Sequence, residues 1–587
     1  MKRVLLALVL GLLTTGLAAD DWVADSDAHA RVLLEVMAEF NPELATRRGV
    51  DGVEDRIMDL EDARFEREQS ALIGAIAELR KRQDDEQDPR VAEDIQIMLD
   101  WAENQVTGNR LQQEMLIPWF NLPEVIFGSV QAMLDPRFPE ERRHLLVRRL
   151  ERYAGLTEEN EPIATLARER IAERMDVEDL LGPYRPELQR HIGSTEQMLA
   201  GTRKLLEQSD LEDWEGPWET LETQISEYMD WAEAELLPEA REESRLPSQL
   251  YAHNLRQVGV DISTDSLTRQ AVTAFAELQA QMRSLAVQIA DKRGWEITDY
   301  REILARLKEE QIDPDEVLDL YKQRLQDIEE IIAEHNLVTL PDRDASIRLA
   351  DEAESIARPA PHMSPPRLIG NTGEYGEFVL PMIVLDEDGQ PLAYDDFTHE
   401  AATWPLTAHE ARPGHELQYS ALVEEGVSIA RIVFAMNSTN VEGWALYSEA
   451  IIAPYLSLEA QLATLQFRLL RAARAFLDPM INQGELSIDQ ARQLLIDDVV
   501  LSQAMARQEV DRYAWRAPGQ ATSYFYGYMR LMELRGRVEL AMRDDFDASE
   551  FHDFILAQGI LPPDMLAEAV MRDFVGAEAD EEEDQTE

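Results

Sequence analysis

The chain has 587 residues, of which 45% are apolar, and its formal net charge is −59. This length exceeds what one hydrophobic core usually serves, so we expect a globular protein with two lobes. The charge argues against nucleic acid and anionic membranes as partners, because both would repel the protein.

The first 18 residues resemble a secretory signal peptide. Lys2 and Arg3 form a short basic region, residues 4–13 are apolar, and residues 16–18 read Gly-Leu-Ala, a small-x-small cleavage site. The chain contains no cysteine, so it offers no cysteine for a lipid anchor and forms no disulfides. We therefore expect a periplasmic or secreted protein without a stable membrane anchor. Its oligomeric state does not follow from these features.

Residues 19–350 are expected to form an N-terminal helical lobe. Apolar residues recur at intervals of three and four, as in the run from Val32 to Phe40, and charged residues occupy the positions between them. Proline and glycine separate these periodic segments. The pattern is that of a succession of amphipathic helices.

Residues 351–400 are rich in proline and are expected to hold a short β-ribbon. Residues 378–385 are apolar and partly β-branched, and an acidic turn follows them. Pro381 within this run predicts an edge strand, which can pair with an extended peptide. Tyr375, just before the run, is a candidate for contact with substrate. The alternative interpretation is a proline-rich connector between the lobes.

Helical periodicity then returns, and residues 401–576 are expected to form a second, catalytic lobe before a disordered acidic tail at 577–587. The most informative pattern of the chain lies near the start of this second lobe, where residues 406–418 read LTAHEARPGHELQ. It brings His409, Glu410 and His415 within seven residues. Two imidazoles and a carboxylate suit a catalytic zinc site, in which the imidazoles bind the metal and the carboxylate takes a proton from the water it activates.

The spacing of these histidines differs from the usual H-E-x-x-H. On a straight helix, positions six apart point about 120° away from each other. Pro413 and Gly414 must therefore interrupt the helix if both histidines are to meet one metal. The alternative is that His409 and His415 are unrelated histidines at a helix end. The nearby His399-Glu400 pair we interpret as incidental.

A catalytic zinc usually takes a third protein ligand, which we expect on another segment. Residues 441–449 read VEGWALYSE, after a polar stretch that can start a helix. Glu442 is the candidate ligand. Glu449 follows seven residues later, on the same helical face. Both glutamates lie among apolar residues, so the alternative is that they form buried ion pairs.

A further segment, residues 515–527, reads WRAPGQATSYFYG. Tyr524 and Tyr526 are candidates for donating a hydrogen bond to a developing oxyanion. Gln520 and Tyr526 are also candidates for contact with substrate. The alternative is that these aromatic residues belong to the core.

Three segments, TAHEARPGHELQ, VEGWALYSE and PGQATSY, occur in the order found in the bacterial domain-of-unknown-function family 885, and the chain resembles that family. The early run FNPELATRRG, residues 40–49, is similar to the family's beginning. The family is grouped with zincin-like metallopeptidases and is distantly similar to helical zinc peptidases of the angiotensin-converting-enzyme and oligopeptidase type. The resemblance implies a mainly α, two-lobed fold with a short β-ribbon beside an active-site channel.

The resemblance also implies roles for individual residues. His409, His415 and Glu442 correspond to the ligands of a Zn²⁺ ion, Glu410 to the general base, and Tyr524 to an oxyanion donor. Apart from the resemblance, we expect Glu449 behind the ligands. One position departs from the family pattern, because Asn482 stands where a histidine often follows an arginine-rich helix. This departure puts full activity in doubt without touching the ligands.

The sequence thus favours an exported zinc metallopeptidase acting on short peptides. Two alternatives remain open at this stage. One is a non-catalytic helical binding or scaffold protein with a degenerate site, and the other is a zinc hydrolase of esters or amides other than peptides.

Overall fold

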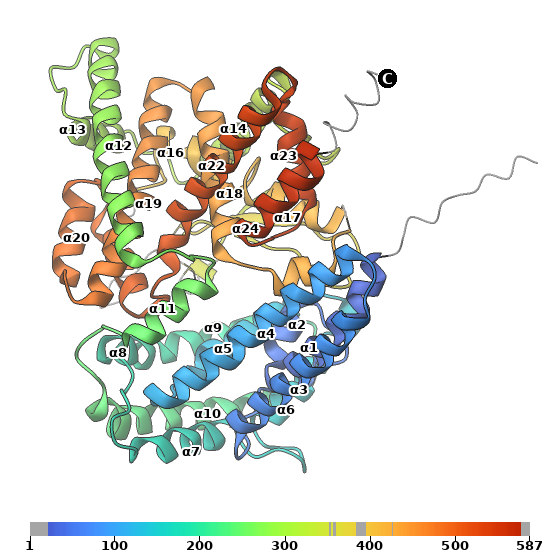
Figure 1. The fold of residues 1–587 in the computed structure, drawn as a ribbon. Helices are drawn as coiled ribbons and strands as arrows, with labels where there is room; N and C mark the ends of the chain where they lie inside the picture. The colour runs from blue at the N-terminus through green and yellow to red at the C-terminus, as the bar shows by residue number, and fades with distance from the viewer. Residues whose placement is uncertain are drawn as a thin grey trace, which may run out of the picture.

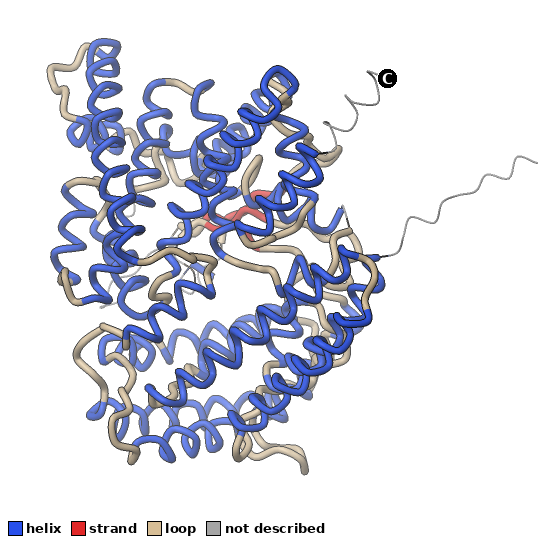
Figure 2. Tube along the Cα trace, viewed as in Figure 1, coloured by secondary structure: helices blue, strands red, loops and turns tan. Residues whose placement is uncertain are grey.

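The computed structural model describes residues 22–350, 354–355, 358, 360–382, 395–424 and 426–576. The expected signal peptide and the acidic tail lie outside these described residues. Helices dominate the described part of the chain, and Figure 2 shows only a small patch of strand among them. The expectation of a mainly α-helical fold with one short β element is confirmed.

The first ten helices form most of the lower part of the molecule in Figure 1. Their bounds are α1 (Trp22–Phe40), α2 (Pro42–Arg48), α3 (Arg64–Asp85), α4 (Pro89–Met115), α5 (Leu122–Leu134), α6 (Leu145–Tyr153), α7 (Ile163–Met175), α8 (Arg185–Gly193), α9 (Thr195–Gln208) and α10 (Glu215–Trp231).

The later helices form the upper part, apart from α11, which lies between the two parts in Figure 1. Their bounds are α11 (Ser248–Gln257), α12 (Thr264–Arg293), α13 (Tyr300–Lys308), α14 (Val317–Glu334), α16 (Glu400–Glu410), α17 (His415–Glu424), α18 (Ser438–Ile452), α19 (Leu458–Gln483), α20 (Ile488–Asp497), α21 (Gln503–Asp511), α22 (Ser523–Met542), α23 (Ala548–Ala557) and α24 (Pro563–Ala569).

Short helical segments of other types connect or extend these helices. Tight 3₁₀ turns are η1 (Glu140–Arg142), η3 (Leu237–Glu239), η5 (Ala453–Tyr455), η7 (Gln520–Thr522) and η8 (Arg543–Asp545). Single π-helical turns are η2 (Ala232–Leu236), η4 (Ala430–Phe434), η6 (Arg512–Arg516) and η9 (Val570–Phe574). Among the described residues, no helix combines the length and the hydropathy that a membrane span requires.

Helix α12 shows why the sequence folds this way. The side chain of Ser263 accepts a hydrogen bond from a backbone N–H at its start, and Gly294 ends it in the left-handed conformation, at φ +67°. Its buried residues, spaced at three, four or seven, form one apolar face: Leu267, Ala271, Leu278, Met282, Ala286 and Ile289. This face packs mainly against α19.

The sheet contains three strands in the order β1-β3-β2, with bounds β1 (Ser346–Leu349), β2 (His362–Ser364) and β3 (Glu377–Leu380). Strand β3 pairs with β1 in parallel and with β2 antiparallel. The prediction that it is an edge strand is therefore wrong, because β3 is central. Pro381 does not disturb the pairing, since the strand ends one residue before it. Residues 383–385 of the expected strand lie outside the described residues.

Two hydrophobic clusters contain residues from both sides of residue 350. One cluster joins Tyr251–Leu307 to side chains between Ala401 and Tyr526. Another joins residues of α1, α3 and α4 to residues of α17, α18, α22 and α23. Helices from both ends of the sequence therefore hold α16, α17, α18 and α22 in place.

Candidate metal centre

The two histidines of the LTAHEARPGHELQ segment lie on either side of a break between two helices. Helix α16 ends at Glu410 and α17 begins at His415, so the predicted interruption at Pro413-Gly414 is confirmed. A Cβ atom on Gly414 would lie 1.9 Å from the carbonyl oxygen of His409, so only glycine fits. The indole Nε1 of Trp444 donates to the carbonyl of Pro413 at 2.8 Å and ties the break to α18.

Helix α18 carries the predicted third ligand. The side chain of Asn437 accepts a hydrogen bond from the N–H of Asn440, which caps the start of the helix and places Glu442 in its second turn. Close contact with α22 occurs at a pair of glycines. A Cβ atom on Gly443 would lie 2.6 Å from the backbone of Gly527. The two helices can therefore approach closely beside Glu442.

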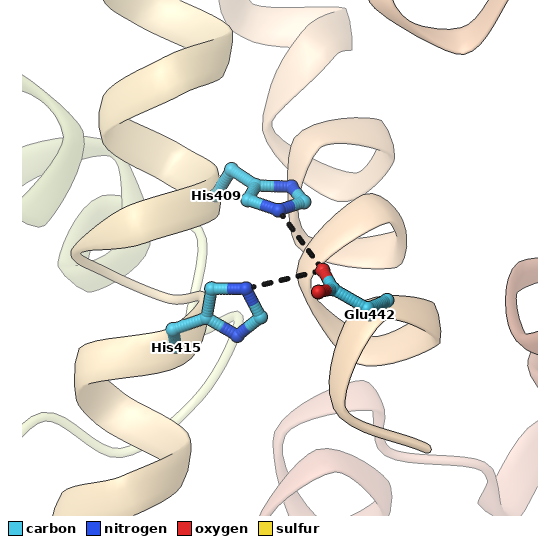
Figure 3. Close-up of side chains that lie close together, drawn as sticks. All are labelled: His409, His415 and Glu442. Carbon is cyan, nitrogen blue, oxygen red and sulfur yellow. Dashed lines mark ion pairs between the residues drawn. The ribbon is translucent and has the colours of Figure 1, made fainter. Parts of the chain in front are cut away.

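His409, His415 and Glu442 converge on one point, as Figure 3 shows. The carboxylate Oε2 of Glu442 lies 3.4 Å from Nε2 of His409 and 3.3 Å from Nε2 of His415. Two ligand atoms bound tetrahedrally to zinc at about 2.0–2.1 Å are themselves about 3.4 Å apart. The candidate ligand atoms all lie within 4.8 Å of one another. Two histidines and one glutamate at these distances fit a zinc ion, and they leave a fourth position open.

The charges in the cluster also favour a cation. Burial by itself would lower the pKa of His409, but hydrogen bonds to Glu442 and Glu449 and the charge of Glu410 raise it to about 9. Burial would raise the pKa of Glu442, yet both histidines hold it well below its usual range. The side chain of Glu442 is 15% exposed and that of His415 8% exposed. Buried carboxylates and imidazoles in this arrangement bind a proton when no metal neutralises them.

Glu449 lies behind His409. Its Oε1 is 2.8 Å from Nδ1 of His409, and Arg471 contributes a longer contact of 3.4 Å to the same oxygen. A histidine that donates its Nδ1 proton to a carboxylate presents the lone pair of Nε2 to the opposite side. For His409 that side is the one facing Glu442.

Glu410, the predicted base, is the last residue of α16. Its side chain is buried, and among the described residues it has no hydrogen-bond or ion-pair partner. Its charge acts on His409 and, more distantly, on Tyr321 and His362. A carboxylate that is free of structural partners is available to accept a proton from a bound water.

Tyr524 lies beside the cluster. Its ring is stacked on that of His409, with centroids 6.2 Å apart and an interplanar angle of 12°. Its hydroxyl accepts a hydrogen bond of 2.9 Å from Arg512. Gln520 belongs to the same network, because its amide oxygen accepts from Arg512 and its amide nitrogen donates to Ser438 at 2.8 Å.

Two other predicted residues lie elsewhere. The hydroxyl of Tyr526 donates to Asp261 and accepts from Arg530 at 2.9 Å, so this side chain is engaged away from Tyr524. The ring of Tyr375 is covered by the guanidinium of Arg343, at 3.6 Å from the ring centre. The expectation that these two tyrosines contact substrate gains no support from their positions.

Asn482, the departure from the family pattern, is buried in α19. Its amide donates to the side chain of Asp478 at 3.1 Å and to the carbonyl of Tyr513 at 3.1 Å. Burial raises the pKa of Asp478 to about 7, against the hydrogen bonds that it accepts from the backbone of Gly519 and from Tyr251. Asn482 therefore helps to join α19 to the segment that leads to Tyr524.

Sequence reasoning missed the arginines around Tyr524. Arg471 and Arg474 on α19 and Arg512 on η6 have guanidinium carbons 5.7, 4.5 and 5.1 Å from the ring centre of Tyr524. The available signal was the series of arginines three apart within the apolar face of α19, which requires buried partners.

Comparisons with known proteins identify the family. The family model described as "Bacterial protein of unknown function (DUF885)" matches residues 42–570, so the chain belongs to this family. The predicted family is thereby confirmed. The search among curated proteins found no significant match.

Two solved structures share the fold over nearly the whole chain. One, from Colwellia psychrerythraea, is described as a "putative lipoprotein" and has a TM-score of 0.75 at 18% identity, over 94% of this chain and 100% of that one. The other is a "putative lipoprotein of unknown function" from Shewanella oneidensis, with a TM-score of 0.72 at 17% identity, over 94% and 99% of the two chains. At this identity the likeness shows the fold alone.

Proposed function

We propose that this member of the DUF885 family is an exported zinc-dependent metallopeptidase that hydrolyses short peptides. The observation that carries the proposal is the convergence of His409, His415 and Glu442 on one point at the spacing of zinc ligands. Glu449 behind His409 and the unpartnered Glu410 beside it complete the set of groups that such an enzyme requires.

The roles of the residues follow from their positions. When bound, zinc supplies a Lewis acid that polarises a carbonyl and lowers the pKa of a water molecule. The two histidines and Glu442 would hold the ion. Glu410 accepts the proton that the attacking water loses and then returns it to the leaving amine.

Tyr524 supports the same reaction. Its hydroxyl accepts a hydrogen bond from Arg512, so the hydroxyl proton points away from Arg512 and can be donated to another group. Donation of that proton to the carbonyl oxygen stabilises the negative charge that develops there. Burial raises the pKa of Tyr524, which keeps the hydroxyl protonated at neutral pH, although the charge of Arg512 acts in the opposite direction.

Export is supported by residues 1–18 and by the relatives that are described as putative lipoproteins. This chain has no cysteine to carry a lipid, so we propose an unanchored form. N-terminal sequencing of protein from fractionated cells tests this part. A mature chain beginning near Ala19 supports export, and a chain that keeps Met1 in the cytoplasm contradicts it.

The activity is tested with the full mature chain, with and without zinc, on a mixture of short peptides. We expect hydrolysis that a chelator abolishes and zinc restores. Glu410→Gln is expected to keep zinc and lose at least about a hundredfold in turnover, the usual scale for loss of a general base. The matched control is Glu424→Gln, because Glu424 lies at the end of α17, where it pairs with Arg343.

The outcomes separate the alternatives. Zinc binding with cleavage only of esters or non-peptide amides would favour a different hydrolase. Absence of both zinc and hydrolysis would favour a binding or scaffold protein.

A further inference from the structure

The arginine nearest the hydroxyl of Tyr524 shares its carboxylate partner, Glu509, with a second arginine. Arg512 donates through two nitrogens to the neutral amide oxygen of Gln520 and to the hydroxyl of Tyr524. The nearest carboxylate oxygen belongs to Glu509, at 3.9 Å. Glu509 is already held by Arg474, through two hydrogen bonds of 2.7 and 2.6 Å. The charge of Arg512 is therefore compensated only by this longer, shared contact, and its side chain is 23% exposed.

Another arginine lies one turn along the same segment. Arg516 stacks on Trp515 with its guanidinium carbon 5.1 Å from the ring centre, and it has no hydrogen bond or ion pair among the described residues. Two carboxylates lie nearby, but each has another partner: Asp511 pairs with Arg190 at 2.5 Å, and Glu124 accepts from Asn121 at 2.7 Å.

The electrostatic surroundings of Arg516 agree with this description. Partial burial, together with the charge of Arg190, lowers its pKa to about 10. Such a cation is stabilised by any anion that binds beside it. The chain carries 115 acidic residues against 56 basic ones, so a pair of arginines without a close acidic partner of their own is a local exception to its composition.

We infer that Arg512 and Arg516 bind the free C-terminal carboxylate of the substrate, so that the enzyme cleaves near the C-terminal end of peptides. A guanidinium presents paired donors that match a planar carboxylate. The inference rests on the proposed function, because it names the substrate class of the same site. It also explains how a strongly acidic protein can hold an anionic group beside its cluster of glutamates.

The reach from the cluster sets the length of the released fragment. The ring of Tyr524 is 6.2 Å from that of His409, and the guanidinium carbon of Arg512 is 5.1 Å from the centre of the Tyr524 ring. An extended chain advances about 3.3–3.6 Å per residue. These two distances set an upper limit on the separation, so a carboxylate no more than about three residues beyond the cleaved bond reaches Arg512, which predicts release of short C-terminal fragments.

The test measures binding without turnover. Zinc-loaded Glu410→Gln protein is titrated calorimetrically with N-acetyl-pentaalanine and with its C-terminal amide. We expect the free acid to bind at least about tenfold more tightly than the amide, since a charged hydrogen-bonded group is lost in the amide. Arg512→Gln and Arg516→Gln, each added to this background, are expected to reduce that preference. The matched control is Arg537→Gln, which alters an exposed arginine of α22 and is expected to keep it.

The outcomes distinguish this inference from the proposed function. Equal binding of the acid and the amide overturns the inference and leaves the peptidase proposal standing. Binding of neither peptide by zinc-loaded protein overturns both. A purely positioning role of Arg512, acting through Tyr524, would leave the preference for the acid intact in Arg512→Gln and would also overturn the inference.

A third peptide identifies the source of the carboxylate. It carries glutamate as its last residue and a C-terminal amide. Binding of this peptide as tightly as the free acid would mean that the site recognises acidic side chains, and cleavage near the C-terminal end would no longer follow. Binding as weak as that of pentaalanine amide supports recognition of the C-terminus.

Discussion

The Nδ1 atom of His409 lies 2.8 Å from a carboxylate oxygen of Glu449, on the side of the ring opposite Glu442. Glu442 and Glu449 belong to one helix, two turns apart, so α18 supplies both the candidate metal ligand and the group that orients the histidine. The orientation of the His409 ring therefore depends on α18, which supplies Glu449, as well as on α16, which carries His409 itself.

The metal content provides the first prediction. The purified mature protein is expected to bind about one zinc ion, and His409→Ala, His415→Ala and Glu442→Ala are each expected to lose most of it, because three protein ligands hold a catalytic zinc. Elemental analysis after dialysis measures the content. His144→Ala is the control, since His144 is exposed. Full zinc occupancy in all three ligand variants would contradict the assignment of these residues as zinc ligands.

Glu449 provides the second prediction. Glu449→Ala is expected to weaken zinc binding by about 10–100-fold, the usual effect of losing a carboxylate behind a histidine ligand. Glu449→Gln keeps an oxygen that accepts the Nδ1 proton of His409, so it should lose less zinc affinity than Glu449→Ala. Competition with a chelator of known affinity measures both. Equal zinc affinity in wild type and Glu449→Ala would show that the contact does not support the metal.

The features predicted correctly from the sequence are local ones. Pro413-Gly414 interrupts a helix because of the backbone geometry of those two residues, and Asn437 caps α18 through a hydrogen bond within four residues. The shared face of Glu442 and Glu449 follows from the helical repeat alone. These three local rules were sufficient to predict a candidate metal centre.

The features that the sequence did not reveal depend on distant parts of the chain. Strand β3 is central because β1 and β2, short and partly polar, flank it, and neither carries a clear strand signal. Arg512 donates to Tyr524 across an irregular connection with a π-helical turn and a 3₁₀ turn, for which no periodicity predicts direction. Tyr526 differs from Tyr524 in its surroundings because residues two apart on a helix point to different sides.

The two tyrosines of α22 provide the third prediction. Tyr524→Phe is expected to lower turnover about a hundredfold, because it removes roughly 3 kcal/mol of transition-state stabilisation. The stability of the fold should change little. Tyr526→Phe is the matched control: the hydroxyl it removes contacts Asp261 and Arg530, so it should leave turnover unchanged. Steady-state kinetics on one cleaved peptide compares them. Unchanged turnover in Tyr524→Phe would return this residue to a structural role.

The buried pair of Glu509 and Arg474 provides the last prediction, which concerns stability. Both side chains are 5% exposed, and they share two hydrogen bonds. Burial alone would raise the pKa of Glu509, but the charge and hydrogen bonds of Arg474 lower it from 4.5 to about 2. A carboxylate with a lowered pKa stabilises the fold above its unfolded pKa, and this contribution is lost as the pH falls from about 4.5 towards 2.

Glu509→Gln leaves Arg474 buried without its charged partner, so a loss of about 3–5 kcal/mol in the free energy of unfolding is expected at pH 7. The difference between the variant and the wild type should shrink at pH 3, because the wild type then loses part of the same interaction through protonation. Urea unfolding followed by tryptophan fluorescence at both pH values measures it. Glu103→Gln is the control, because Glu103 pairs with Arg80 while 48% exposed, and it should change stability by less than about 1 kcal/mol. A deficit in Glu509→Gln that is equally large at pH 7 and pH 3 would contradict the low pKa, since the loss would then come from packing and not from the charge of Glu509.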